Sequence, residues 1–262
     1  MKTIKNHHEP FLFYNEKKIK IITSKILNET YNIKFGISSI NENIWKLYIV
    51  DYDSLEEKEI KTPETFVIEG NIYKRFSEYN GFVYMFGGSY KISYVVGLHI
   101  GKDNFAPKYF MVEGDLDITT NTVNNIRLIN DTGFQRSGYA YKNYLIYNYY
   151  NNLLIDNTAD NEDIVSENLD PYFDTLSKII GVWGDDTKII VTGYNKNDPK
   201  NFKSFLYNTI LKQFIPVIHN SNFLIYKCSI LETENKTKLL AWTDKVFNFP
   251  LSSDYILNID VL

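Results

Sequence analysis

Pairs of carboxylates are the residues of this sequence that are best suited to chemistry. In the segment "EGDLD", Asp115 and Asp117 stand two residues apart, so a strand would place both side chains on one face. A glycoside hydrolase uses two carboxyl groups that lie about 5–10 Å apart on either side of the scissile bond. The spacing agrees with such a pair, although a chain with 32 acidic residues contains similar pairs by chance.

A second pair follows a tryptophan in the segment "GVWGDD". Trp183 precedes Asp185 and Asp186, and an aromatic ring beside carboxylates is a suitable platform for a sugar ring. The two segments make a carbohydrate-binding module or a glycoside hydrolase the alternative interpretation of this chain.

Motifs for other kinds of catalysis are missing from the sequence. It contains no G-x-S-x-G, HExxH or CxxC motif and none of the glycine-rich loops that bind nucleotides. The histidines are best explained as structural residues, and the one cysteine as a small buried hydrophobe; these residues are His7, His8, His99, His219 and Cys228. The sequence therefore predicts no catalytic residue, no cofactor and no metal.

The acidic segment "DNTADNEDIVSEN", residues 156–168, offers a calcium loop as an alternative. Asp156, Asp160 and Glu167 fall at oxygen-ligand positions of an EF-hand loop, but Asn161 stands where the sharp turn requires glycine. We expect an exposed loop or linker here instead.

The composition favours strands over helices. The chain has 29 Asn, 25 Lys and only 4 Ala, a bias that AT-rich codons explain, and 16% of its residues are aromatic. Alanine is the best helix former, whereas tyrosine, isoleucine and phenylalanine fit strands. Runs of β-branched and aromatic residues, separated by polar turns, predict strands at 17–23, 31–37, 44–50, 64–70, 82–86, 91–100, 108–114 and 143–150.

The last third of the chain shows signals for two helices. Asp170 and Pro171 are a suitable N-cap and first helical residue, and Gly181 is placed to end that helix. Asp198 and Pro199 repeat the signal. An apolar stripe then follows at helical spacing, formed by Phe202, Phe205, Leu206, Ile210 and Phe214. Strands are predicted at 187–193, 222–230 and 237–247, so a βαβ crossover fits this region.

A glycine doublet raises the question of a repeat fold. The stretch "FVYMFGGSYKISYVV", residues 82–96, resembles a strand of a kelch-type propeller blade. A propeller predicts self-similarity at a period of about 40–50 residues, and no second doublet occurs. A hairpin turn is therefore expected at Gly87 and Gly88, because glycine tolerates positive φ.

Taken together, these patterns predict an α+β protein. The expected parts are a mostly antiparallel β domain at 1–155, the acidic linker at 156–168, and a smaller α/β unit with two capped helices at 169–262.

The function expected on these grounds is structural. A chain without catalytic motifs and rich in tyrosine, a residue favoured at interfaces, suits a non-enzymatic subunit of a symmetric assembly, and the expected kind is a connector or tail protein (ring or adaptor) of a bacteriophage virion. Its expected partners are further copies of itself and other structural proteins, with Trp183, Tyr90 and Tyr94 as candidate interface residues.

Charge and hydrophobicity bear on location and on other partners. The net charge of −4 argues against direct nucleic-acid binding. No stretch approaches the roughly 20 apolar residues of a membrane span, and the N-terminus lacks a secretory signal. We therefore expect synthesis in a host or bacterial cytoplasm, no membrane association, and a place in the virion if the protein is viral.

Overall fold

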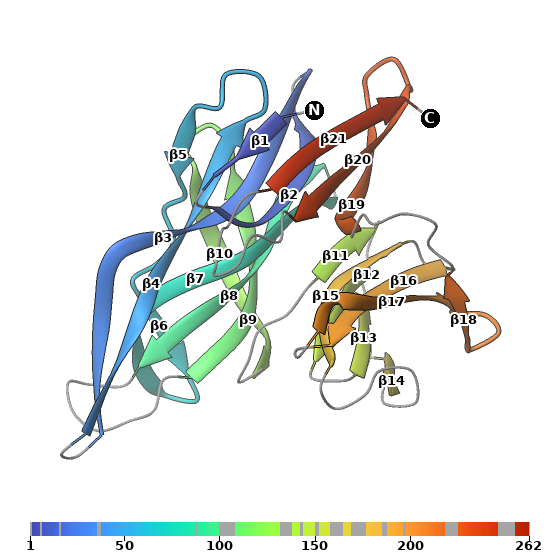
Figure 1. Ribbon diagram of the computed structural model, residues 1–262. Helices are drawn as coiled ribbons and strands as arrows, with labels where there is room; N and C mark the ends of the chain where they lie inside the picture. The colour runs from blue at the N-terminus through green and yellow to red at the C-terminus, as the bar shows by residue number, and fades with distance from the viewer. Residues whose placement is uncertain are drawn as a thin grey trace. The chain divides into compact units, whose positions relative to one another are not determined.

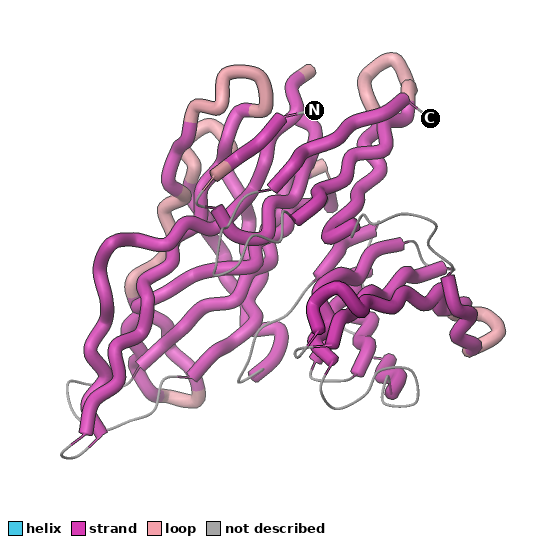
Figure 2. The backbone as a smooth tube through the Cα atoms, viewed as in Figure 1, coloured by secondary structure: helices cyan, strands magenta, loops and turns pink. Residues whose placement is uncertain are grey.

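The structure, a computed structural model, consists of strands joined by turns (Figures 1 and 2). It describes residues 2–5, 7–15, 17–35, 38–86, 88–99, 108–131, 138–141, 144–149, 152–157, 165–168, 177–184, 188–195, 198–217, 225–245 and 255–261. No helix occurs among these residues, and so none that could cross a membrane. The predicted α+β class is therefore wrong, and the described chain is β throughout.

The chain forms two compact units. One comprises Asn6–Gln135, and the other comprises Met1–Lys5 together with Arg136–Leu262. The first unit contains two antiparallel sheets. One has the order β2(His7–Asn15), β3(Lys18–Phe35), β4(Ser38–Asp51), β5(Glu57–Glu59); the other has the order β10(Thr122–Asp131), β9(Lys108–Asp117), β8(Ser89–His99), β7(Asn71–Phe86), β6(Thr65–Ile68).

The second unit contains three antiparallel sheets of four strands each. Their orders are β11(Gly138–Tyr141), β12(Tyr144–Tyr149), β13(Asn152–Asn157), β14(Val165–Asn168); then β15(Ser177–Gly184), β16(Lys188–Asn195), β17(Asp198–Asn208), β18(Gln213–Val217); and finally β1(Lys2–Ile4), β21(Tyr255–Val261), β20(Lys238–Lys245), β19(Ile225–Glu232).

The order of the strands follows one rule in all five sheets. Strands that are consecutive in the chain are neighbours in the sheet, and the single exception is that β1 joins β21 and so completes the last sheet. A series of meanders of four or five strands, with the first strand added to the last sheet, is the connectivity of a β-propeller. A propeller was not expected, because the sequence shows no repeat period. The connectivity of the strands shows that this absence was misleading.

The core of the Asn6–Gln135 unit lies where its two sheets pack together. The rings of Phe11 on β2 and Phe82 on β7 meet edge to face, with centroids 6.3 Å apart. A Cβ on Gly81 would lie only 3.1 Å from side-chain atoms of Ile22 and Leu47, so glycine lets the two sheets approach closely. Strand β8 is buried over most of its length, which explains why its apolar run predicted it well.

The hairpin prediction for the glycine doublet is confirmed. Phe86 on β7 pairs with Ser89 on β8, so the doublet forms the connection, and Gly88 has a φ of 80° that glycine adopts without strain.

The two predicted helices are wrong within the described residues. Residues 171–176 lie outside them, and 177–180 belong to β15. Asp198 and Pro199 begin β17, in which residues 202–208 pair with β16 and residues 204–208 also pair with β18. The side-chain oxygen of Asn208 then accepts hydrogen bonds from the amides of Ile210 and Leu211 and forms a turn. Ladder hydrogen bonds to two neighbouring strands outweigh a local capping signal, because they satisfy the whole backbone.

Candidate functional site

Both carboxylates of the predicted pair on β9 accept hydrogen bonds from neighbouring residues. Asp115 accepts hydrogen bonds from Lys91 and, at 2.7 Å, from Asn125, and these lower its pKa. Asp117 accepts hydrogen bonds from the backbone amides of Thr119 at 2.8 Å and Thr120 at 3.2 Å, which caps the turn into β10. The side chain of Thr120, followed by these two amides, lowers the pKa of the Asp117 carboxyl. The structure thus gives both residues stabilising roles: a cross-strand ion pair and a turn cap.

A third acid on the same strand was missed by the sequence reasoning. Glu113, two residues before Asp115, is almost completely buried, and Arg127 Nε donates to it at 2.8 Å from β10. It belongs to the "EGDLD" segment, so the alternating acids were the available signal. Glu113 and Asp115 thus have cationic or amide partners on the strands next to β9, whereas the partners of Asp117 lie in the turn that follows.

The second predicted pair lies mostly outside the described residues. Trp183 is on β15, opposite Ile190 on β16, whereas Asp185 and Asp186 fall in the part of the chain that is not described.

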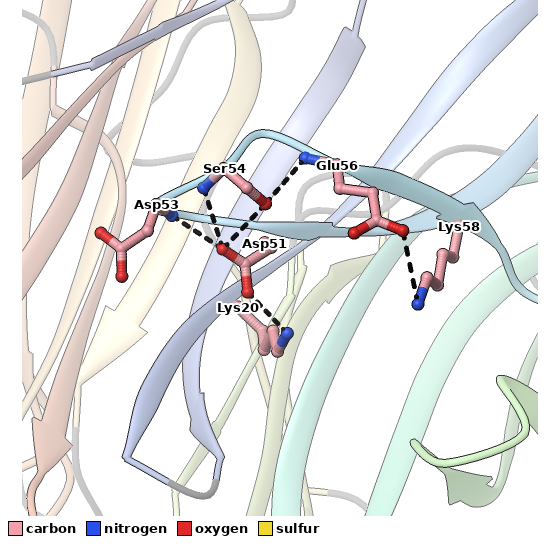
Figure 3. A network of polar contacts seen from close by, with 6 residues as sticks. All are labelled: Lys20, Asp51, Asp53, Ser54, Glu56 and Lys58. Carbon is pink, nitrogen blue, oxygen red and sulfur yellow. Dashed lines mark hydrogen bonds and ion pairs between the residues drawn. The ribbon is translucent and has the colours of Figure 1, made fainter.

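The acids at the end of β4 form a turn network (Figure 3). Asp51 accepts the amides of Asp53 and Ser54 at 3.0 Å each, and Lys20 Nζ lies 2.8 Å from its other oxygen. The hydrogen bond from Lys20, followed by that from Ser54, holds the pKa of Asp51 well below its usual range. Ser54 Oγ also accepts the amide of Glu56. The cluster therefore fixes the connection to β5 and leaves Asp51 ionised.

Glu78 on β7 differs from all of these acids because it is completely buried. Arg75 lies three residues earlier, with its guanidinium nitrogen 3.0 Å from a Glu78 oxygen, and Thr62 Oγ1 donates to the other oxygen. Burial raises the pKa of Glu78, against the lowering effects of Arg75, Thr62 and Lys46. A raised pKa is typical of acids that hold or deliver protons, but a carboxyl with no exposed surface does not reach a bulky substrate.

The candidate interface tyrosines both contact other residues of the Asn6–Gln135 unit, Tyr90 as a partly exposed side chain and Tyr94 as a buried one. Tyr90 on β8 donates its hydroxyl to the carbonyl of Tyr14 at 2.9 Å and packs edge to face on Phe13. Tyr94 on the same strand has no exposed surface, and burial together with the charge of Glu78 raises its pKa well above the usual value. Contacts of Trp183, Tyr90 and Tyr94 with another chain stay a prediction.

The residues weighed as metal ligands are dispersed. Asp156 lies on β13 and Glu167 on β14, and Asp160 is not described. His7 lies 3.3 Å from Glu57, and the ring of His99 leans on Phe76. Within the described ranges, no group of three or more His, Cys, Asp or Glu side chains is placed to hold a metal ion.

Solved structures with the same fold give the chain its class. A thermostable family-43 glycoside hydrolase matches 98% of this chain and 90% of its own, with a TM-score of 0.53 and 9% identity. An α-L-arabinofuranosidase from Lactobacillus brevis matches 98% of this chain and 91% of its own, with a TM-score of 0.52 and 11% identity. No protein-family model and no curated protein matches the sequence. At these identities the likeness establishes the fold, which is that of these enzymes.

This finding corrects the expected function. A non-enzymatic connector or tail subunit of a bacteriophage was inferred from missing motifs, yet solved structures with this fold include glycoside hydrolases. The alternative interpretation, which rested on carboxylates and aromatic residues, agrees better with the fold.

Proposed function

We propose that this protein is a glycoside hydrolase. The observation that carries the proposal is the shared fold over 98% of the chain, with TM-scores of 0.53 and 0.52 to two enzymes that cleave glycosides. Both matches cover about nine-tenths of the other chain, so the resemblance extends over the enzymes' own domains. Because one of them is an α-L-arabinofuranosidase, α-L-arabinofuranosides are the first substrates to test.

The catalytic carboxylates that we propose are Asp185 and Asp186, with Trp183 as the sugar platform. Asp115 and Asp117 are weaker candidates, because an acid that donates a proton needs a raised pKa, whereas partners lower the pKa of both. Glu78 has a raised pKa but no exposed surface.

Chromogenic substrates test this proposal directly. The full chain is incubated with 4-nitrophenyl α-L-arabinofuranoside and a panel of other 4-nitrophenyl glycosides, and release of nitrophenol is followed. We expect cleavage that falls by about 10²–10⁴-fold in Asp185→Asn or Asp186→Asn, the usual contribution of a catalytic acid or base. Asp117→Asn is the matched control and should keep full activity, because asparagine also suits a turn.

Two outcomes would count against the assignment. Turnover that survives both substitutions would show that these aspartates are not the catalytic residues. The absence of turnover on every glycoside would show that the protein is not a glycoside hydrolase.

The second candidate is a carbohydrate-binding module, which the engagement of Glu113, Asp115 and Asp117 in ion pairs and a turn favours. It predicts retention on arabinan or xylan in affinity electrophoresis without any cleavage.

A further inference from the structure

The segment between β5 and β6, residues 60–64, crosses from one sheet of the Asn6–Gln135 unit to the other, and we call it the strap. The amide of Ile60 donates to the carbonyl of Leu47 on β4 at 2.9 Å, in the first sheet. The amide of Lys61 donates to Asn121 at 2.7 Å, and Val123 on β10 returns a bond to Lys61 at 2.9 Å.

The other end of the strap is bound to β7 of the second sheet. The amide of Arg75 donates to the carbonyl of Glu64 at 2.9 Å. Between these points, the Thr62 hydroxyl donates to the carboxylate of Glu78. The strap therefore runs over Glu78, whose side chain is completely buried.

Side chains from three strands face Glu78 beneath the strap. Arg75 comes from β7, Lys46 from β4 and Tyr94 from β8, and all three act electrostatically on Glu78 or are acted on by it. The guanidinium of Arg75 is 3.0 Å from the carboxylate, and the side chain of Arg75 is 16% exposed. The hydroxyl of Tyr94 is buried and makes no hydrogen bond to any described residue.

We propose that the strap is a pH-sensitive connection between the two sheets, and that the stability of its hydrogen bonds to them depends on the charge of Glu78. With the strap closed, Glu78 has no contact with water, which disfavours its charged form. With the strap open, water reaches the carboxylate and its charge is stabilised. Ionisation of Glu78 therefore favours opening, and protonation favours closing.

The direction of the pH effect follows from this difference. Burial raises the pKa of Glu78 in the closed state above the ordinary value that we expect in the open state. The extra stability of the closed strap is complete below the open-state pKa and is lost as the pH rises through the closed-state pKa. Opening should increase about tenfold for each unit by which the two pKa values differ, and then level off.

Hydrogen–deuterium exchange of the strap amides measures this opening. The reporters are the amides of Lys61, Arg75 and Val123, and the amide of Leu55 in the β4–β5 turn is the reference. Protection factors are compared between pH 4 and pH 8 after correction for the intrinsic exchange rate. We expect protection of the strap amides in the wild-type protein to fall over this range, and that of Leu55 to stay constant.

Three variants isolate Glu78 as the cause. Glu78→Gln should remove the pH dependence, whereas Glu64→Gln, which changes an exposed acid on the strap itself, should leave it unchanged. Arg75→Met removes the compensating cation, so the fall in protection should extend to higher pH. Because Glu78 is neutral at low pH in Arg75→Met, this variant can still test the proposal if Glu78→Gln does not fold.

The idea is overturned by strap protection that does not change with pH in the wild-type protein. It is equally overturned if the wild-type pH profile persists in Glu78→Gln, or if Arg75→Met leaves that profile where it was.

Discussion

Asp51 stands at the end of β4, where a lysine, two backbone amides and a serine hydroxyl all donate to one carboxylate. Asp115 and Glu113 on β9 are bound in a comparable way by Lys91 and Arg127. Asp115 and Asp117, which looked suited to catalysis in the sequence, therefore stabilise a strand pair and a turn. A pair of acids in a sequence does not reveal its cationic donors, because Lys20, Lys91 and Arg127 come from other strands.

The turn network of Asp51 leads to a prediction with a defined pH dependence. Asp51→Asn keeps the turn geometry but loses the charge-assisted bond to Lys20, and it should lower the free energy of unfolding by about 1 kcal/mol at pH 7. Because the folded-state pKa of Asp51 is depressed, its contribution is present above the unfolded-state pKa of about 3.9 and is lost as the pH falls further.

Urea unfolding at pH 7 and pH 3 checks this expectation. The difference between wild type and Asp51→Asn should be present at pH 7 and should shrink at pH 3. Glu56→Gln in the same turn should stay within about 0.5 kcal/mol of wild type, because its partner Lys58 lies 3.5 Å away and both side chains are largely exposed. A pH-independent loss in Asp51→Asn would mean that the Lys20 pair contributes nothing.

Among the elements, the strands with apolar alternation could be predicted from the sequence and the polar ones could not. The run predicted at 91–100 corresponds to β8(Ser89–His99), and that at 108–114 to β9(Lys108–Asp117). Strand β5(Glu57–Glu59) is exposed at all three positions, so no hydrophobic pattern marks it. Its backbone pairing with β4 alone makes it a strand.

The region 198–214 shows how one apolar pattern suits two periods. Spacings of three and four residues from Phe202 to Phe214 suggested one helical face, yet alternate residues also share a face of a strand. In β17 the ring of Tyr207 is buried and lies 4.6 Å from that of Phe214 on β18. Ile210 is 75% exposed in the turn, although the helical stripe would have buried it.

Two substitutions distinguish the strand that the structure shows in this region from the helix that the sequence suggested. Tyr207→Ala should lower the free energy of unfolding by about 3 kcal/mol, because it removes a large buried ring. Ile210→Ala should change it by less than about 0.5 kcal/mol, as is usual for an exposed position. Thermal unfolding of both variants makes the comparison. If Ile210→Ala lowers the stability as much as Tyr207→Ala, the apolar residues form a helical face after all.

At the scale of the whole molecule, the fold is specified by strand order rather than by a repeated sequence. Two glycoside hydrolases share this fold at 9% and 11% identity. Each sheet needs only alternating apolar residues, a turn after each strand and a neighbour to pack against, and many side-chain combinations satisfy these needs. Five meanders can therefore follow one another without a detectable period, which is why the sequence did not reveal the propeller connectivity.

The last sheet draws its strands from both ends of the chain, and this leads to the final prediction. Strand β1 pairs with β21, with Lys2 opposite Leu257 and Ile4 opposite Tyr255. Ile4 is 4% exposed and Leu257 is fully buried, whereas Thr3, which precedes Ile4 on β1, is exposed. Ile4→Asp would place a charge among apolar side chains and should destabilise this sheet by about 3 kcal/mol or more. Thr3→Asp, one residue away on the opposite face of the same strand, should stay within about 0.5 kcal/mol of wild type.

Urea unfolding followed by tryptophan fluorescence compares the two variants, since Trp242 lies on β20 of this sheet. Equal stability of Ile4→Asp and Thr3→Asp would show that β1 does not help to hold the last sheet together.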